Sequence, residues 1–419
     1  MITFVDLFAG GGGLSEGFAQ AGLTGIAHVE ADQNACLTLR TREAYRYLRR
    51  TANLALYRDY LRMKSTREEL YKNLPKGTLD SVIECKISRH SIHQVIRQIE
   101  KNLAAIGATS LDVLAGGPPC QPFALIGRHH NGQIVYDSRR WLFRQFLTVL
   151  EEFTPSTFVF ENVPGLSSMR DGAIYRKILL AFDKAGYDTI TKTVDSGEFG
   201  VLQQRKRLLI LGSRRHQPVL LAAPKPCRIK GIVGDALADL PAVEPGSDAS
   251  ADGYAEKPIG YLAAAGLRDR YDLLTLHMAR VQNARDRRIY RLVAETWHKE
   301  KRRLLCSELP NGLRPDRSVE CFRDRFKVVA PDLAHSQTVI AHIANDGHYY
   351  IHPDVAQARS ITVREAARLQ SFPDSYFFEG SRRSIFRQIG NAVPPLLGRA
   401  VALAIVNAFA AGKRERIPA

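Results

Sequence analysis

The sequence predicts an α/β fold in which a largely parallel sheet is covered by helices on both faces and joined to a second, smaller domain. Short apolar segments with the length of buried strands occur at 2–6, 25–30, 111–115, 157–161 and 207–212. Helical patterns separate these segments, and strands that alternate with helices form parallel sheets with both faces covered. Pro, Gly and Asp become frequent near Arg214, and this change predicts the start of the second domain.

The bulk composition predicts a basic globular protein that binds a polyanion. The 419 residues are 45% hydrophobic, which is enough for at least one large core. Lys and Arg outnumber Asp and Glu by 59 to 43, and a net charge of +16 is typical of nucleic-acid binding, although generically basic soluble proteins share it. The chain has no run of roughly 18 to 20 apolar residues and no basic leader, so we expect a cytoplasmic location and no membrane partner.

The cysteines predict reduced thiols and no metal site. They are scattered singly, without the paired spacing that binds zinc or forms the disulfide framework of a small secreted domain. The six positions are Cys36, Cys85, Cys120, Cys227, Cys306 and Cys321.

The first strand leads into a glycine-rich segment, DLFAGGGGLSEGF at 6–18, that is typical of ligand-binding turns. Glycines at a strand-to-helix turn let backbone amides approach a ligand, and the helix N-terminus favours negative charge. The dinucleotide fingerprint is incomplete because Ser15 follows Gly10 and Gly12, so a nucleotide-like ligand other than NAD is favoured. Glu30 ends the second strand, where an acid can bind the ribose hydroxyls of an adenosine. The alternative is a tight turn beside a solvated acid.

Helices are expected at both ends of the chain and between the strands. The periodic or apolar segments are 14–22, the basic stretch 33–74, the charged stretch 275–305, ITVREAARLQSF at 361–372, and the residues after Pro395. The last two have the composition of core helices. They predict that the C-terminus returns to complete the first domain.

The segment GGPPCQPF at 116–123 follows directly after the apolar strand at 111–115 and predicts a catalytic loop. Ligands of open α/β sheets bind at the carboxyl ends of strands, and the prolines and glycines restrict the loop that holds Cys120 there. Nucleophilic catalysis needs a thiolate, so we expect neighbours that lower the pKa of Cys120. A structural cysteine in a turn is the alternative.

Two further segments put charged groups at the ends of apolar strands. Glu161 lies at the end of the strand within FVFENVPGL (158–166), where a carboxylate can bind the ring nitrogen and amino group of a base; an N-cap or surface acid is the alternative. In QQRKR (203–207), Arg205 and Arg207 share one side if the backbone is extended, which suits a phosphate or carboxylate. A solvated basic edge would give the same pattern.

In this order and spacing, the four motifs resemble those of bacterial DNA (cytosine-5) methyltransferases. RQIGNAVPP at 387–395 is similar to the closing motif of that family, and REAARLQSFPD at 364–374 is similar to the helix before it. The resemblance extends from Asp6 to Pro395. It implies a Rossmann-like sheet of the S-adenosylmethionine-dependent methyltransferases and a smaller target-recognition domain.

The resemblance also implies a division of the chain. Residues 1–214 would form the catalytic domain, 215–357 the target-recognition domain, and 358–419 the segment that completes the catalytic domain. About forty extra basic, tyrosine-bearing residues at 41–75 are a helical insertion. The insertion is a DNA-facing element, a protein contact or a plain solvated helix pair.

Carried over residue by residue, the resemblance implies roles for eleven positions. Catalytic roles fall on Cys120, Glu161, Arg205 and Arg207; cofactor contacts on Phe8, Gly11, Gly13, Glu30 and Asn391; and contacts in the DNA or base pocket on Gln121 and Gln203. Methyl transfer from S-adenosylmethionine to carbon 5 of a flipped cytosine would proceed through a covalent Cys120 adduct. The implied partner is double-stranded DNA, and the implied enzyme is a monomer in the bacterial cytoplasm, associated with the nucleoid. It is an orphan or is paired with a restriction endonuclease.

Two positions depart from the family pattern. Ala124 stands where the family commonly has a serine, which removes a hydroxyl that would contact the DNA backbone. In ECKIS at 84–88, Lys86 stands where the family usually offers an Asp to the adenine amino group.

Two other functions are consistent with the motifs. A related branch methylates transfer RNA, but the large variable domain and the stretch AHSQTVIAHIANDGHYYIHPD at 334–354 resemble bacterial DNA enzymes. An inactive DNA-binding relative is the other alternative. Retention of Cys120, Glu161 and both arginines argues against it, because a binding protein needs no thiol in that loop.

Overall fold

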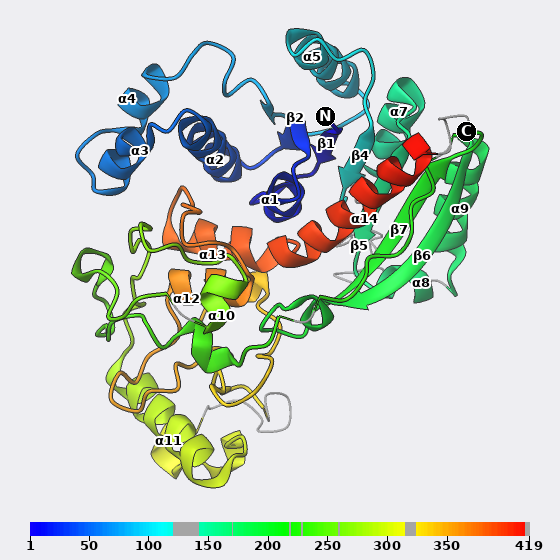
Figure 1. The fold of residues 1–419 in the computed structure, drawn as a ribbon. Helices are drawn as coiled ribbons and strands as arrows, with labels where there is room; N and C mark the ends of the chain where they lie inside the picture. The colour runs from blue at the N-terminus through cyan, green and yellow to red at the C-terminus, as the bar shows by residue number, and fades with distance from the viewer. Residues whose placement is uncertain are drawn as a thin grey trace.

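The computed structural model describes residues 1–119, 142–169, 171–217, 219–227, 229–258, 260–314 and 324–414. Within these ranges, seven strands form one sheet in the order β3-β2-β1-β4-β5-β7-β6 (Figure 1). The strands are β1 (Thr3–Leu7), β2 (Thr24–Glu30), β3 (Val82–Glu84), β4 (Val113–Gly116), β5 (Thr157–Asn162), β6 (Tyr187–Asp195) and β7 (Lys206–Arg214).

The strand pairing confirms the predicted α/β class and adds two strands that the sequence did not reveal. Strands β3, β2, β1, β4 and β5 are mutually parallel, whereas β7 is antiparallel to both β5 and β6. The missed β3 has only three residues, and the missed β6 is an edge strand in which exposed and half-buried residues such as Asp188 and Lys192 interrupt the apolar pattern. Edge strands carry such polar residues because one side of the sheet has no partner.

Helices account for most of the remaining regular structure. The α-helices are α1 (Gly13–Gln20), α2 (Gln33–Arg50), α3 (Leu54–Leu61), α4 (Arg67–Lys72), α5 (Ile92–Ala105), α7 (Leu142–Phe153), α8 (Gly165–Ser168), α9 (Ala173–Lys184), α10 (Gly260–Ala264), α11 (Ala284–Glu300), α12 (Val363–Leu369), α13 (Arg382–Asn391) and α14 (Pro395–Arg414). The predicted helix at 275–305 is therefore shorter, because it begins after the N-cap Asn283, whose side chain accepts a hydrogen bond from the backbone N–H of Asp286.

The sheet has an apolar core on each face. On one face, α1 and α14 contribute Phe18 and Val401, which lie in one buried cluster with Phe4 of β1. On the other face, α5, α7 and α9 cover the sheet, and Phe146 and Phe182 pack against strand residues. The C-terminal helix thus returns to the first strand, as the apolar composition after Pro395 predicted.

One helical stretch, Arg382–Gly412, is long and apolar enough to cross a membrane, with a mean hydropathy of 1.6 over its best window. The expectation that no such stretch exists was therefore wrong. However, 61% of that window is buried within the protein, and α14 packs closely against α1. A core helix of a globular domain can have the same length and hydropathy as a membrane-spanning helix. The packing of α14 against α1 is that of a core helix.

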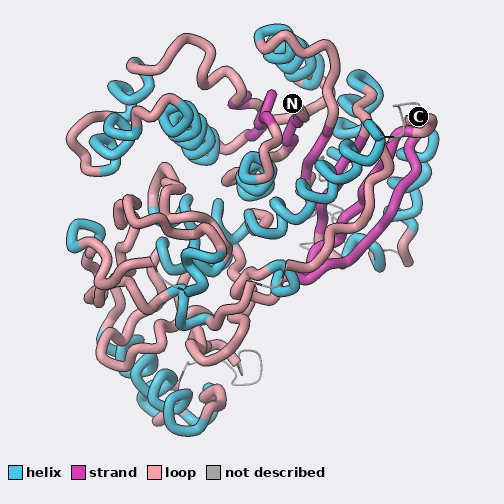
Figure 2. The backbone as a smooth tube through the Cα atoms, in the orientation of Figure 1, coloured by secondary structure: helices cyan, strands magenta, loops and turns pink. Residues whose placement is uncertain are grey.

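The region between β7 and α13 consists mainly of loops, as Figure 2 shows below the sheet. Besides α10, α11 and α12, its regular structure comprises short 3-10 turns: η3 (Val233–Ala236), η4 (Ser250–Asp252), η5 (Cys306–Glu308), η6 (Asn311–Leu313) and η7 (Ala341–Ala344). Another such turn, η2 (Ser196–Phe199), connects β6 toward β7. Loop-rich structure agrees with the Pro, Gly and Asp content that marked this region in the sequence.

Candidate active site

The glycine-rich segment forms a tight loop between β1 and α1 that is bound to the end of β2. Its backbone has positive φ at Phe8 (63°), Gly10 (55°) and Gly12 (78°), a conformation that glycine adopts without strain but phenylalanine rarely does. The backbone N–H of Gly10 donates to Oε2 of Glu30 at 2.8 Å, while Oε1 accepts from the N–H groups of Ala31 and Asp32. Glu30 is therefore oriented by three backbone donors at the carboxyl edge of the sheet.

The C-terminal segment forms the opposite wall of this loop. A Cβ atom at Gly13 would lie 2.0 Å from the carbonyl oxygen of Val393, and one at Gly11 would lie 3.1 Å from Cβ of Gln388. The hydroxyl of Tyr376 donates to the carbonyl oxygen of Gly11 at 2.8 Å. Gly11 and Gly13 are thus required for close packing against the chain around α13.

Gly10 differs from its neighbours because a Cβ atom there would meet nothing within 4 Å. Open space beside a backbone of positive φ leaves room for a ligand next to the N-terminus of α1. Asn391 is exposed at the end of α13, three residues after the Gln388 that packs on Gly11. Together, the open glycine, the oriented Glu30 and the half-exposed Phe8 are compatible with an adenosine-type cofactor.

A buried polar chain lies beneath the glycine loop, and the sequence analysis missed it. The Ser15 hydroxyl donates to Asp6 Oδ2 and lies 2.9 Å from Nδ1 of His28, a fully buried side chain. Nε2 of His28 lies 3.4 Å from Oε1 of Glu43 on α2. Burial raises the pKa of Asp6 to about 6, against the lowering effect of the Ser15 hydrogen bond. Polar residues within apolar strand segments were the available signal, but their contacts come from distant positions.

The described start of the GGPPCQPF loop is fastened to the end of β5. A Cβ atom at Gly117 would lie 2.5 Å from Oε2 of Glu161, so a larger residue here would displace this carboxylate. The side-chain amide of Asn162 donates to the carbonyl oxygen of Pro118 at 3.2 Å. Two motifs that lie more than forty positions apart in the sequence, from the loops after β4 and β5, therefore meet here.

Glu161 forms an ion pair with Arg207 on the neighbouring strand β7. Nε of Arg207 lies 2.7 Å from Oε1 of Glu161, and each side chain is 13% exposed. A short, partly buried contact of this type fixes the plane of the carboxylate. Oε2 points toward Gly117, so Glu161 connects the QQRKR segment to the loop that follows β4.

Arg205 does not share this position, so the expectation of two arginines side by side on one face is corrected. Arg205 precedes β7, is 1% exposed, and donates to the carbonyl oxygens of Val339 and Gly390 at 2.8 and 2.9 Å. Burial, followed by the nearby charge of Arg207, lowers the pKa of Arg205 to about 9. The backbone leaves the strand at this point, and Arg205 joins β7 to α13 and to the loop around Val339.

Gln203 is also buried and bound entirely within the protein. Its Nε2 donates to the carbonyl oxygen of Leu369 at 2.9 Å and contacts the side chain of Gln370, while its Oε1 accepts from the N–H of Val339 at 2.9 Å. In this arrangement, Gln203 holds the loop around Val339 against α12 and has no free polar atom for a base.

Three positions of interest, Cys120, Gln121 and Ala124, lie outside the described residues. Lys86 is exposed after β3, where its carbonyl oxygen accepts a hydrogen bond from the Ser91 hydroxyl.

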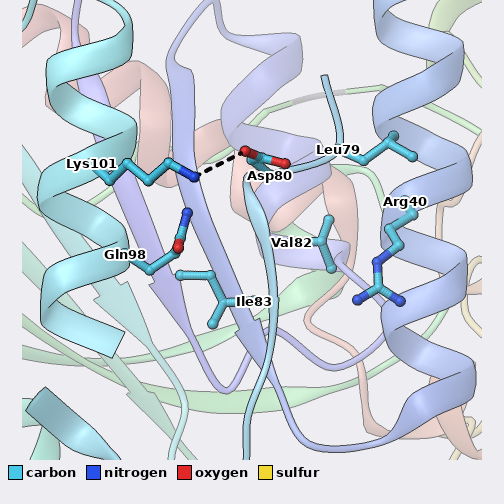
Figure 3. Close-up of a pocket in the computed structure, with 7 residues that line it drawn as sticks. All are labelled: Arg40, Leu79, Asp80, Val82, Ile83, Gln98 and Lys101. Atoms are coloured by element: carbon cyan, nitrogen blue, oxygen red, sulfur yellow. Dashed lines mark ion pairs between the residues drawn. The ribbon is translucent and has the colours of Figure 1, made fainter. Parts of the chain in front are cut away.

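A separate hollow of about 380 Å³ follows the outer edge of β3 between α2 and α5 (Figure 3). An ion pair of 3.7 Å joins Lys101 to Asp80 across it, and Arg40 is paired with Glu84. The lining includes Leu79 and Asp80, which precede β3, and none of the residues of the glycine loop. This hollow is therefore distinct from the carboxyl-edge site.

These features define the class of the protein as an open α/β sheet with a glycine loop, an oriented acid and a strand-end loop converging on its carboxyl edge. Residues 2–47 and 82–407 match the family model described as C-5 cytosine-specific DNA methylase, and the chain belongs to that family. The enzyme is a DNA (cytosine-5)-methyltransferase, and family membership implies the use of S-adenosylmethionine and a DNA substrate.

Named relatives agree over nearly the whole chain. The chain is 36% identical to the Type II methyltransferase M.Bpa9945I of Bacillus paralicheniformis, covering 96% of this chain and 98% of the relative. It is 33% identical to the Type II methyltransferase M.XorII of Xanthomonas oryzae, covering 97% of this chain and 84% of the relative. The transfer-RNA and inactive-relative alternatives are not favoured.

The fold is shared with a DNA modification methyltransferase encoded within a prophage of E. coli. The TM-score is 0.62 at 22% identity, and the alignment covers 98% of this chain and all of the other. This likeness supports the Rossmann-like methyltransferase fold.

Proposed function

We propose that the enzyme methylates carbon 5 of a cytosine flipped out of duplex DNA, with Cys120 as the covalent nucleophile and Glu161 as the group that binds ring nitrogen 3. One observation carries this proposal: the loop that leads to Cys120 is fastened against Glu161. Gly117 closely approaches the carboxylate, Asn162 holds Pro118, and Cys120 follows two residues later in the chain.

The chemistry suits these residue types. Cytosine carbon 5 is a weak nucleophile, so the Cys120 thiolate first forms a bond to carbon 6. Glu161, oriented by Arg207, holds a proton at ring nitrogen 3 and stabilises the charge that addition places on the ring. S-adenosylmethionine, when bound, supplies the methyl group that carbon 5 takes. Loss of the carbon-5 proton and elimination of Cys120 then restore the aromatic ring and the thiolate.

The base must leave the duplex before Cys120 can reach carbon 6. Flipping costs a few kcal/mol, which contacts to phosphates and to the pocket offset. The net charge of +16 supports phosphate binding, whose affinity falls as salt concentration rises.

The residues around the glycine loop would hold the cofactor. Glu30 would bind the ribose hydroxyls through the lone pairs that its three backbone donors leave free. Phe8 and Asn391 would complete the walls, while Gly11 and Gly13 permit the close packing that gives the site its shape.

The target sequence would be chosen by the loop-rich region 215–357, with 1–214 and 358–419 forming the catalytic domain. Base-edge contacts from such a region give specificity, and phosphate contacts give affinity. The Type II names of the relatives support a role in a restriction-modification system.

Trapping with a duplex that contains 5-fluorocytosine tests the nucleophile. Fluorine replaces the proton that must be lost, so the native enzyme should accumulate a covalent complex in the presence of S-adenosylmethionine. Cys120→Ala should form none, whereas the control Cys227→Ser, at an exposed cysteine, should react normally. Glu161→Gln should slow complex formation about 100-fold or more while duplex affinity stays within about threefold. A covalent complex with Cys120→Ala would refute the assignment.

A further inference from the structure

The family model leaves residues 48–81 unmatched, and in the structure these residues form an added helical element next to α2. It contains the end of α2 and helices α3 and α4 (Figure 1). A small core formed by Tyr45, Tyr57 and Leu70 holds the three helices together. The added element, hereafter the insertion, is therefore a folded part of the catalytic half.

The insertion binds one buried carboxylate, that of Glu379 in the loop between α12 and α13. The Tyr60 hydroxyl of α3 donates to Glu379 Oε1 at 2.6 Å, and Nη1 of Arg67 on α4 lies 3.5 Å from Oε2. Thr41 of α2 donates to the same Oε1 at 2.6 Å, and its hydroxyl lies 2.8 Å from that of Tyr71. Three helices thus converge on a side chain that is 6% exposed.

Glu379 is also part of a closed ring of hydrogen bonds that reaches the glycine loop. Its backbone N–H donates to the Thr38 hydroxyl at 2.8 Å, and that hydroxyl donates to Oε1 of Gln388 at 2.7 Å. Nε2 of Gln388 closes the ring by donating to the carbonyl oxygen of Glu379 at 2.9 Å. Gln388 is the residue whose Cβ packs against Gly11. The ring therefore joins α2, the loop that carries Glu379, and α13, whose Gln388 packs against Gly11.

The insertion also carries exposed basic side chains away from Glu379, namely Arg49, Arg50, Arg62 and Lys64, for which the structure gives no contact with that carboxylate. The insertion lies beyond the β3 end of the sheet, whereas Glu161 is on β5, four strand positions from β3 (Figure 1). At about 4.8 Å per strand, that separation is roughly 19 Å. The hydrogen bonds and the ion pair that the insertion makes with Glu379 define its inner face. This face is on the side of the proposed cofactor site and is remote from the proposed base pocket.

We propose that the insertion braces the cofactor site, with Glu379 as the positioning residue through which α3 and α4 hold α13 against the glycine loop. The inference rests on the proposed cofactor site. A brace acts on S-adenosylmethionine affinity because α13 carries Gln388 and Asn391 on the wall that packs against the loop. Loss of the brace should have little effect on the affinity for duplex DNA or on kcat at saturating S-adenosylmethionine.

The test compares inner-face variants of the full-length enzyme with a variant at exposed basic residues. Calorimetric titration with S-adenosylmethionine in the absence of DNA should show about 5- to 30-fold weaker binding for Glu379→Gln and about threefold weaker binding for Tyr60→Phe. KM for S-adenosylmethionine should rise in parallel, while kcat and the Kd for duplex DNA stay within about twofold. The double variant Arg62→Ala/Lys64→Ala, at exposed positions, should bind the cofactor as the native enzyme does.

Two outcomes would overturn the proposal. One is unchanged cofactor affinity in both inner-face variants; the other is an equal loss of cofactor and DNA affinity, as a general loss of folding would give. Tyr60→Phe removes only one hydroxyl and keeps the ring against Phe377, so it remains informative if Glu379→Gln does not fold. Failure of the native enzyme to bind S-adenosylmethionine would instead refute the proposed function.

Discussion

The sheet and the loop-rich region between β7 and α13 are held together by different forces. Between the sheet and the helices α7 and α9, Phe146, Phe158 and Phe182 form a cluster of edge-to-face and tilted rings with centroids 4.3 to 6.0 Å apart. Their burial removes apolar area from water and requires no polar partner.

In the loop-rich region, α12 carries charged side chains into the interior. Arg368 is fully buried, its Nε and Nη2 donate to Asp374 at 2.9 and 2.6 Å, and its Nη1 donates to Asp239 at 2.5 Å. Asp239 also contacts Arg268, whose guanidinium stacks 3.5 Å from the centroid of the Tyr254 ring. Residues that precede α12 in the chain, such as Asp239, are therefore attached to α12 partly through buried ion pairs.

The difference predicts how each region tolerates change. Apolar packing is non-directional, so a side chain of similar volume is accepted at modest cost. A buried ion pair has a large desolvation cost, so removal of one partner leaves a charge that nothing compensates. Exposed residues of the loop-rich region should therefore tolerate exchange, whereas Asp239 must continue to match Arg368.

The largest effect is expected for Arg368→Ala. It leaves Asp239 with Arg268 and Asp374 with Arg364 as their remaining cationic neighbours, and breaking a buried pair of this kind costs about 3–5 kcal/mol of unfolding free energy. Urea denaturation followed by circular dichroism measures the loss. Arg302→Ala, which removes exposed ion pairs with Glu300 and Glu308, is the control and should leave the midpoint unchanged. A loss no greater than that of the control would show that the buried pairs contribute little.

The sequence predicted the features that depend on local pattern. Apolar runs gave five of the seven strands, and the glycine and proline loops at 6–18 and 116–123 indicated where the carboxyl edge would carry chemistry. The pairing of Arg368 with Asp239 was not predictable, because a charged residue in an isolated sequence has the same appearance whether solvated or buried. The buried position of Gln203 was missed for the same reason, since its partners come from α12 and the loop around Val339.

A smaller effect is expected in the sheet for Gly212→Ala. Gly212 of β7 lies directly opposite Phe158 of β5, and a Cβ atom there would lie 1.9 Å from the Phe158 ring. Overpacking of this kind costs about 1–3 kcal/mol. Phe158→Leu should cost about 1 kcal/mol alone but should relieve the clash, so the double variant should lose less than the sum of the two.

Urea denaturation of the two single variants and the double variant measures this coupling. Gly165→Ala is the control, because a Cβ atom there meets nothing within 4 Å. Additive losses in the double variant would mean that the ring and the glycine are not coupled.

The smallest effect concerns Asp6, a buried residue of β1 whose carboxylate accepts a hydrogen bond from Ser15. Burial raises the pKa of Asp6 to about 6 from an ordinary value of 3.8, so the folded protein retains a proton that the unfolded chain releases between about pH 4 and 6. As pH rises through this window, the stability of the native protein falls, because ionisation is easier in the unfolded chain. Asp6→Asn cannot ionise, so its stability relative to the native protein should increase between pH 4 and 7.

Glu16 on α1 gives the opposite sign and serves as the matched comparison. Burial alone would raise the pKa of Glu16, but Arg42 and Arg46 lower it to about 2, so its contribution is present above about pH 4.5 and is lost as pH falls toward 2. In urea denaturation at pH 4 and pH 7, Glu16→Gln should therefore be more destabilising at pH 7, where Asp6→Asn is more favourable. The same pH trend in both variants would contradict this expectation. It would show that neighbouring groups in the sheet offset the desolvation of Asp6, as the ion pairs on α12 offset the desolvation of their charged groups.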